Sequence, residues 1–311
     1  MIREIAYKDR SEWLAMRRGY IGGSDAGAVM GLDDYKSPYS LWAEKTGRVP
    51  EFEGNVATRV GSYLEELVAR IFCEETGKQV RRKNRMLVND AYPFACADLD
   101  RVVVGEKALL ECKTTNSFPV MRRVGKNEYP ERWYCQMVHY LAVTGLERAY
   151  LAVLVGCRDF HTFTLERDEA EIAALMDAEA RFWRLVTEDT PPAPDGSDAT
   201  ETAIETVYRD SRDDTVTLYG RRPILDERAA LTARKRELED RIREIDNIIK
   251  ADLGEAETGE TDGWRVTWKP QTRSSFQRDA FEADHPDIDP DGYYKQTTTR
   301  TYKIKEFKED K

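Results

Sequence analysis

Residues 109–113 read Leu-Leu-Glu-Cys-Lys, and this short run is the strongest structural signal in the chain. Its two leucines predict a strand that starts in a buried core. Side chains alternate between the faces of a strand, so Glu111 and Lys113 lie on one face. A carboxylate beside an ammonium on a rigid strand can hold a metal ion and orient a water molecule. Two further Glu-x-Lys triplets, at residues 306–308 and 309–311, lie in a charged tail without an apolar lead-in.

A second acid, Asp100, is predicted to lie beside Glu111. Asp100–Val104 has the pattern of another strand, and Gly105–Glu106 is a natural turn between the two strands. Antiparallel pairing about this turn brings Asp100 within one cross-strand or diagonal neighbour of Glu111. Two carboxylates at that separation suit a hard cation such as Mg²⁺. On spacing alone, a surface hairpin with an incidental salt bridge remains the alternative.

Two helices contribute further candidates. Thr58–Glu75 has apolar residues at helical spacing, and Glu65 lies at the edge of that stripe, one turn after Gly61. An acid aimed at the edge of a core needs a partner or a metal ion. The second helix opens at Pro130 and carries Gln136, whose amide can support a ligand or contact a phosphate. An amide in such a helix is more often structural.

The elements around these residues predict an α/β fold. Strands interleave with helices along residues 1–188, which favours a mixed central sheet flanked by helices in one domain. Residues 189–200 are rich in Pro, Gly and Asp and are predicted to be a linker.

Residues 201–311 are predicted to form an extension with one long helix and a small β part. The helix is expected over Ile224–Leu253, followed by strand-like runs at Trp264–Lys269 and Tyr293–Ile304. Its narrow apolar stripe suits a coiled coil or a helix packed on one neighbour, and it contains Leu231, Leu238, Ile242, Ile245 and Ile249.

Composition narrows the class of protein. The chain has 311 residues, of which 41% are hydrophobic and 34% charged, so it can bury a sizeable core. No apolar run approaches the roughly 20 residues needed to span a bilayer, and the first ten residues show no signal-peptide pattern. We therefore expect a cytoplasmic protein that does not enter membranes.

The cysteines and histidines argue against other metal centres. The five cysteines are widely spaced and none forms a C-x-x-C pair, so neither zinc nor an iron–sulfur cluster is indicated. Three scattered histidines give little support to a histidine-centred metal site or a Ser/His/Asp hydrolase.

The charge is unevenly distributed. The whole chain has a net charge of −10, but residues 78–126 hold eleven Lys and Arg against five acids, a local charge of 11 − 5 = +6. A charge run is usually a solvated face, but this one surrounds Asp100 and Glu111, so the negative net charge does not exclude a nucleic-acid partner.

Together these residues resemble the PD-(D/E)xK nuclease superfamily. The resemblance rests on Asp100, Glu111-x-Lys113, Gly61-x-x-x-Glu65 and Gln136. The N-terminal run Trp13-x-x-x-Arg17-x-Gly19-x-Ile21-Gly22-Gly23-Ser24-Asp25 and the run Gln136-x-x-His139-Tyr140 are similar to the lambda-exonuclease-like, YqaJ-type viral recombinases. These motifs span roughly residues 10–165. The family's proline is replaced by Leu99, which leaves Asp98 as a rival to Asp100; the eleven-residue spacing to Glu111 favours Asp100.

The resemblance implies a restriction-endonuclease-like nuclease core and a reaction. Mg²⁺, for which Mn²⁺ would substitute, would be held by Glu65, Asp100, Glu111 and the Cys112 backbone carbonyl, with Lys113 positioning the attacking water. Arg17 and Ser24 would bind the 5′-phosphate at the end of double-stranded DNA. The expected activity is 5′–3′ resection of linear duplex in phage-type recombination. The expected partners are a single-strand annealing protein and, in a ring-shaped trimer, other copies of the chain.

Three other functions remain open from the sequence. A site-specific or structure-specific endonuclease would use the same core and metal site. A helicase-linked nuclease with an iron–sulfur cluster is disfavoured by the cysteine spacing. A non-enzymatic DNA-binding or annealing module would need no acid cluster, so Glu65, Asp100 and Glu111 would have no function in it.

Overall fold

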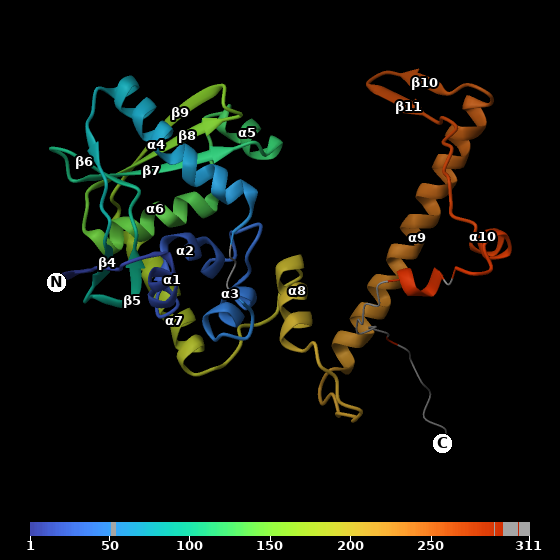
Figure 1. The fold of residues 1–311 in the computed structure, drawn as a ribbon, viewed down its shortest axis with the longest axis horizontal. Coiled ribbons are helices and arrows are strands. Elements are labelled where there is room, and N and C mark those ends of the chain that lie inside the picture. Colours follow the sequence, from blue (N-terminus) through green and yellow to red (C-terminus); the bar gives the residue numbers. More distant parts are fainter. Residues whose placement is uncertain (51–53, 289, 295–303, 305–311) are drawn as a thin grey trace. The chain divides into compact units, whose positions relative to one another are not determined.

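In the computed structural model, β7 (Ala108–Thr115) is the middle strand of a five-stranded sheet with the order β3-β6-β7-β8-β9 (Figure 1). Its neighbours are β6 (Arg101–Val103) and β8 (Arg148–Val155), and the outer strands are β3 (Val80–Arg81) and β9 (Asp159–Glu166). β7 and β8 run parallel, whereas the other pairs are antiparallel. The predicted mixed sheet is confirmed.

Two helices cover the faces of this sheet. On one face lies α4 (Val56–Thr76), whose Phe72 belongs to the same buried cluster as Leu110. On the other face lies α6 (Glu131–Thr144), which shares a buried cluster with Leu109. Leu109 and Leu110 therefore point to opposite faces, as the two-residue period of a strand requires.

A second sheet, which the sequence did not predict, lies beyond α6. It has the order β1-β4-β5-β2, formed by β1 (Ile2–Ile5), β4 (Met86–Asn89), β5 (Tyr92–Ala97) and β2 (Ile21–Gly22). Because α6 packs on β4 and β5 as well as on β8, it is enclosed from two sides. Its side chains are consequently buried from Cys135 to Val143.

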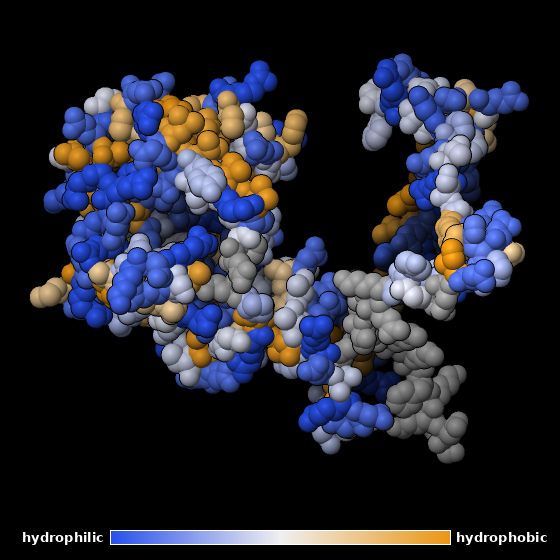
Figure 2. All heavy atoms as spheres, viewed as in Figure 1, coloured by the Kyte–Doolittle hydropathy of each residue, from blue (hydrophilic) through white to orange (hydrophobic). Residues whose placement is uncertain are grey.

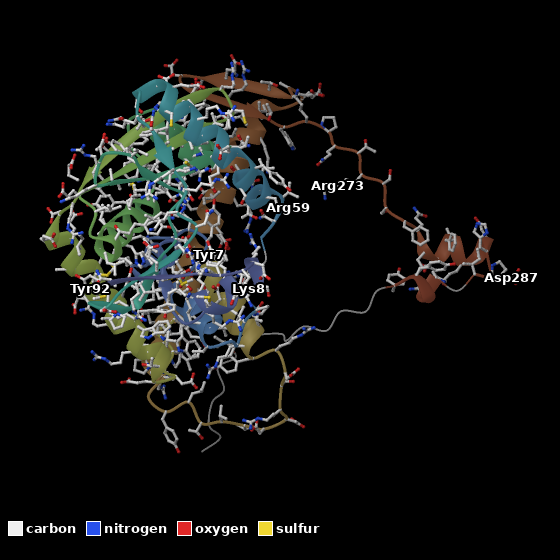
Figure 3. All side chains as sticks on the ribbon, turned by 60° about the vertical axis from the view of Figure 1, so that its left-hand side comes forward. Tyr7, Lys8, Arg59, Tyr92, Arg273 and Asp287 are labelled. Atoms are coloured by element: carbon white, nitrogen blue, oxygen red, sulfur yellow. The ribbon has the colours of Figure 1, made fainter. Side chains whose placement is uncertain are left out.

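The remaining helices of this unit complete its surface. They are α1 (Arg10–Arg17), α2 (Gly23–Val29), α3 (Pro38–Lys45), α5 (Phe118–Val124), α7 (Glu169–Thr187) and α8 (Asp198–Val207). Figure 3 shows side chains filling the space between these ribbons.

The compact unit extends to Arg209, beyond the boundary predicted at residue 188. The difference arises because α8 packs on α3, where the Thr200 hydroxyl donates to Ser37 Oγ at 2.7 Å. Ala203 of α8 is buried in the same cluster as Leu41 of α3. The Pro-rich segment is thus a connection within this unit rather than a boundary between two units.

The second compact unit begins at Asp210. Its long helix, α9 (Arg222–Leu253), matches the predicted helix, and the hairpin of β10 (Thr258–Thr261) and β11 (Trp264–Thr267) supplies the small β part. Helix α10 (Arg278–Asp284) and a 3-10 turn at Pro290–Tyr293 follow.

The structure describes residues 1–50, 54–288, 290–294 and 304. Most of the predicted strand at Tyr293–Ile304 and both Glu-x-Lys triplets of the tail lie outside these residues. Across the described ranges, no helix combines the length and the apolar character needed to cross a membrane.

Candidate active site

The β6–β7 hairpin places Asp100 beside β7. Arg101 pairs with Leu110 and Val102 with Leu109 in an antiparallel register, so Asp100 comes opposite the start of the Glu-Cys-Lys run. Asp100 Oδ2 accepts a hydrogen bond from the backbone N–H of Cys112 at 2.8 Å. This is the cross-strand neighbourhood that the turn at Gly105–Glu106 predicted.

Glu111 and Lys113 project from the same face of β7. Lys113 Nζ lies 2.7 Å from Glu111 Oε1, and the Glu111 side chain is only 5% exposed. The other carboxylate oxygen, Glu111 Oε2, is buried and has no hydrogen-bond partner among the described residues. A buried carboxylate oxygen without a donor is costly, because it has lost its water without gaining another partner.

Helix α6 fixes the orientation of Glu111. Gln136 Nε2 donates to Glu111 Oε1 at 2.7 Å and lies 3.0 Å from the hydroxyl oxygen of Tyr140, one turn along the same helix. Both side chains are buried. Gln136 therefore holds the carboxylate in place, and Tyr140 in turn holds the amide.

The electrostatics of the cluster favour an additional positive charge. Burial raises the pKa of Asp100 well above its usual range, and the nearby carboxylates of Glu111 and Glu65 raise it further. Burial lowers the pKa of Lys113, but Glu111 and Asp100 outweigh burial and leave that pKa raised. One ammonium thus faces two carboxylates that repel each other.

Glu65 has a partner that the sequence did not predict. It lies on α4, whose apolar residues pack against Leu110 and Cys112 of β7. Its carboxylate forms an ion pair with the buried Arg101 guanidinium, which also binds Glu66. Glu65 is near enough to raise the pKa of Asp100, and its own ion-pair partner among the described residues is Arg101.

Among the residues that the structure describes, no three His, Cys, Asp or Glu side chains are arranged to hold a metal ion. Arg101 binds Glu65, and the Cys112 amide binds one oxygen of Asp100. The chemistry of the donors nevertheless fits a divalent cation, since Glu111 Oε2 is unpartnered, and burial together with repulsion by Glu111 raises the pKa of Asp100.

The rival acid, Asp98, is directed elsewhere. Asp98–Asp100 is the link between β5 and β6 and is not itself part of a strand, so the strand alternation assumed for these residues does not apply. Burial raises the pKa of Asp98, whereas hydrogen bonding to Trp13 and the charge of Arg17 lower it. Asp98 therefore faces the N-terminal motif, and Asp100 faces Glu111.

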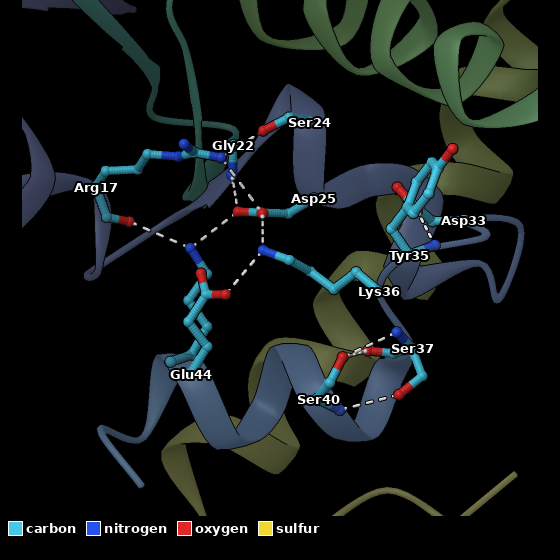
Figure 4. A network of polar contacts seen from close by, with 11 residues as sticks. Arg17, Gly22, Ser24, Asp25, Asp33, Tyr35, Lys36, Ser37, Ser40 and Glu44 are labelled. Carbon is cyan, nitrogen blue, oxygen red and sulfur yellow. Dashed lines mark hydrogen bonds and ion pairs between the residues drawn. The ribbon is translucent and has the colours of Figure 1, made fainter. Parts of the chain in front are cut away.

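The N-terminal motif forms a second polar cluster around Asp25 (Figure 4). Arg17 Nη2 donates to the Ser24 hydroxyl oxygen and lies 3.3 Å from Asp25 Oδ1. The two residues predicted to bind a terminal phosphate are therefore in contact. Asp25 is almost fully buried, and the Gly22 N–H donates to its Oδ2 at 3.1 Å.

Two lysines of this cluster were not predicted. Lys45 Nζ lies 2.9 Å from Asp25 Oδ2, and Lys36 Nζ lies 3.5 Å from Asp25 Oδ1 and 2.8 Å from Glu44 Oε2. Burial raises the pKa of Asp25, but Lys45, Arg17 and Lys36 together leave it well below its usual range. Both lysines follow the glycine-rich motif, in a segment where the sequence offers no pattern that aims them at Asp25.

The basic segment at residues 78–126 is less positive in space than in sequence. Seven of its eleven basic residues form ion pairs with acids, several of them from outside the segment: Lys78, Arg82, Lys83, Arg101, Lys107, Lys113 and Arg123. The local excess of charge is therefore a poor measure of the surface that DNA would meet.

Comparison with known proteins identifies the family. Residues 12–147 match the YqaJ-like viral recombinase domain. The chain is 36% identical over 303 residues to Uncharacterized protein YqaJ of Bacillus subtilis (strain 168), covering 96% of this chain and 94% of that protein. The chain belongs to the YqaJ-like viral recombinase family. The matched range contains Arg17, Ser24, Asp100, Glu111 and Gln136, so both polar clusters lie within the family domain.

Solved structures agree with this assignment at the level of the fold. The alkaline exonuclease LHK-Exo from Laribacter hongkongensis superposes with a TM-score of 0.50 and 21% identity, covering 58% of this YqaJ-like chain and 93% of that chain. Its complex with dAMP gives a TM-score of 0.51 and 22% identity over the same shares of the two chains. This likeness confirms the predicted fold class.

Proposed function

We propose that this protein is a divalent-metal-dependent DNA exonuclease that resects linear double-stranded DNA from its 5′ ends during phage-type recombination. The observation that carries the proposal is the buried cluster of Asp100, Glu111 and Lys113, held by Gln136 and with one unpartnered Glu111 oxygen. Membership of a viral recombinase family and the fold of an alkaline exonuclease support it. The complex of that exonuclease with dAMP contains a nucleoside monophosphate, the product expected of an exonuclease.

We propose that Asp100, Glu111 and the Cys112 carbonyl would hold the cation, with Mg²⁺ as the natural ion and Mn²⁺ as a substitute. Glu65 would join them after exchanging its Arg101 partner for the cation. A divalent ion at this position polarises a phosphate and stabilises the charge of the leaving oxygen. The oxygen ligands favour a hard ion over zinc, and no cysteine or histidine cluster accompanies them in the described part of the chain.

Lys113 has the properties of a positioning group rather than a base. Its raised pKa keeps it protonated at neutral pH, so it donates hydrogen bonds and cannot accept a proton from water. We propose that its ammonium orients the attacking water and offsets charge on the phosphate. Gln136 and Tyr140 keep Glu111 in the orientation that this arrangement requires.

The cluster around Asp25 is proposed to recognise the 5′-phosphate. The side chains of Arg17 and Lys36 are 19% and 26% exposed, so both can reach an anion without leaving the cluster. Arginine suits this role because its planar fork can donate two charge-assisted hydrogen bonds to one phosphate. The cluster combines three cations with Asp25 and Glu44, a net charge of 3 − 2 = +1. An annealing protein and a trimer of this chain remain proposals that rest on the family resemblance.

The experiment follows a linear duplex labelled at the 5′ end of one strand and at the 3′ end of the other. With Mg²⁺, the 5′ label should be released as mononucleotide before the 3′-labelled strand shortens, and EDTA should stop the release. Loss of the 3′ label first would contradict the polarity, and full activity in EDTA would contradict the metal dependence.

End recognition is tested on duplexes with 5′-phosphate or 5′-hydroxyl ends. Wild type should degrade the phosphorylated duplex faster, and Arg17→Ala should remove that preference while leaving slow cleavage, because the proposed metal ligands are unchanged. Arg3→Ala, which removes an exposed arginine paired with Asp90, is the matched control and should keep the preference. Equal rates on both ends by wild type would remove the phosphate role.

A further inference from the structure

Helix α9 has an apolar face that the described residues of the second unit leave uncovered. Along its 32 residues, roughly 48 Å at 1.5 Å per residue, none is buried. Five members of the apolar stripe are between 42 and 63% exposed: Ile224, Leu231, Leu238, Ile242 and Ile245. Figure 2 shows hydrophobic atoms along one side of this helix. A row of large apolar side chains in water indicates a surface made for a partner.

The stripe follows the heptad repeat of coiled coils. From position 224 to position 249 the seam advances by four and three residues in turn. In this register the d positions hold Ile224, Leu231, Leu238 and Ile245, and the a positions hold Arg228, Lys235, Ile242 and Ile249. Every d position in this range is apolar, whereas the first two a positions are basic, and a seam of this length suits another helix of similar length.

Charges beside the seam identify that partner. Arg234 and Arg241 occupy g positions, while Glu239 and Asp246 occupy e positions. In a parallel pair, each g residue faces the e residue five positions later on the other helix. A second copy of α9 would therefore place Arg234 opposite its Glu239 and Arg241 opposite its Asp246.

The antiparallel arrangement would reverse these contacts. It brings g residues against g residues and e residues against e residues, so arginines would face arginines and acids would face acids. Within one helix, Arg234 lies 3.0 Å from Glu237 and Arg241 lies 2.6 Å from Glu244. These exposed pairs are weak and leave both arginines able to bind a second acid.

We infer that α9 binds α9 of a second copy of this chain in a parallel, in-register, two-stranded coiled coil. Two strands are favoured because Arg228 and Lys235 occupy a positions. In a two-stranded seam, a long basic side chain can lay its methylene groups along the interface and keep its charge in water. A polar a position also fixes register and the number of strands. This contact belongs to the second unit and is independent of the proposed nuclease activity.

The test compares the molar masses of full-length charge variants by light scattering after gel filtration. Arg234→Glu/Arg241→Glu makes the four charges at positions 234, 239, 241 and 246 acidic, and Glu239→Lys/Asp246→Lys makes these four charges basic. Each variant alone should have half the mass of wild type, and an equimolar mixture should recover the wild-type mass. Halving is expected because each coiled coil joins two chains and is disrupted in either charge variant alone.

The control is Arg236→Glu/Arg243→Glu, which makes the same charge change at b positions away from the seam and should keep the wild-type mass. Recovery on mixing shows that the variants are folded and able to associate. Wild-type mass in both charge variants, no recovery on mixing, or a fall to one third of the wild-type mass would overturn the inference.

Orientation is tested separately with Leu231→Cys. Equivalent d positions face each other in the parallel pair, so oxidation should join two chains through this residue. Ala233→Cys, on the outer f position, and wild type with its five native cysteines are the controls and should give no comparable cross-link. An antiparallel pair would place position 231 far from its counterpart, so absence of the cross-link would also overturn the inference.

Discussion

At the scale of single residues, removal of the Lys113 side chain should affect the cleavage rate and the DNA affinity differently. Lys113→Ala should lower the cleavage rate on the order of 10²-fold or more while DNA affinity changes little, because it removes water positioning and not a binding surface. Lys107→Ala, which removes an exposed lysine paired with Glu147, is the control. Single-turnover cleavage and equilibrium binding would be measured in parallel, and near-normal cleavage by Lys113→Ala would exclude this lysine from the mechanism.

The two aspartates of the β5–β6 link provide a second test. Asp100→Asn should reduce cleavage severely, because it removes a carboxylate that faces Glu111 and Lys113. Asp98→Asn should be much milder, because its surroundings are Trp13 and Arg17. Cleavage rates under saturating Mg²⁺ give the comparison. The reverse order of severity would show that Asp98 is the ligand.

The same residues show which parts of the site a local sequence pattern can predict. The two-residue period of a strand correctly places Glu111 and Lys113 together, and the tight turn correctly places Asp100 beside them. The period gives no guidance for Asp98, because its segment is not a strand. It also fails to anticipate that Arg101, one residue after Asp100, would bind Glu65. Pairing of that kind depends on the path of α4, which no local pattern encodes.

At the scale of elements, the contact between α2 and α6 depends on a missing side chain. A Cβ at Gly27 would lie 2.7 Å from Arg132 Cβ and 2.9 Å from Arg132 Cα, so α6 would have to move. Gly27→Ala should lower the free energy of unfolding by about 1–3 kcal/mol. Gly61→Ala on α4 is the control, since its Cβ would lie 3.7 Å from Thr114 Oγ1 and alanine favours a helix. Denaturant unfolding of both variants measures the difference. If Gly27→Ala is as stable as Gly61→Ala, α6 can shift away from the added methyl group at little cost.

The buried pair of His139 on α6 and Glu179 on α7 predicts a pH dependence of stability. His139 Nδ1 lies 2.8 Å from Glu179 Oε1, and Nε2 lies 2.8 Å from the carbonyl oxygen of Cys96. Because the carbonyl can only accept, Nε2 carries a proton, and a second proton is shared between Nδ1 and the carboxylate. Burial lowers the pKa of His139, but Glu179 outweighs it and the pKa is raised above 6.5. Burial also raises the pKa of Glu179, and His139 opposes that rise; the short contact with Glu179 favours the protonated histidine.

The pKa of His139 is higher in the folded protein than in the unfolded chain, so protonated His139 stabilises the fold. Its contribution is complete below about pH 6.5 and is lost as the pH rises through the folded-state pKa. The free energy of unfolding should therefore fall with pH above 6.5, by at most about 1.4 kcal/mol per pH unit. His139→Gln should flatten this slope, and His161→Gln, on β9, should leave it unchanged. A slope that survives in His139→Gln would assign it to another group.

Helical and strand periodicity is sufficient to predict most of these elements but not their assembly. Thr58–Glu75 and Ile224–Leu253 were predicted within a few residues of α4 and α9. The second sheet was missed because β1 and β2 are short, with four and two residues, and are stabilised by partners distant in sequence. Such strands depend on tertiary pairing rather than on local pattern.

At the scale of the whole molecule, the chain combines a family domain with a separate second unit. The first unit brings the Asp100–Glu111–Lys113 cluster and the Asp25 cluster into one fold, with α6 between the two sheets as the common support. The boundary at residue 188 was predicted too early because a Pro-rich segment looks like a linker even when the next helix packs back, as α8 does on α3. A Pro-rich segment is therefore a poor guide to the limit of this unit.

The central claim is that this protein acts from DNA ends. The most direct measurement is the initial rate of nucleotide release, in Mg²⁺, from one DNA sequence supplied as a 5′-phosphorylated linear duplex and as a covalently closed circle. The account predicts rapid release from the linear form and none from the circle, with Asp100→Asn inactive on both. Efficient cutting of the closed circle by wild type would contradict the exonuclease and favour an endonuclease on the same core.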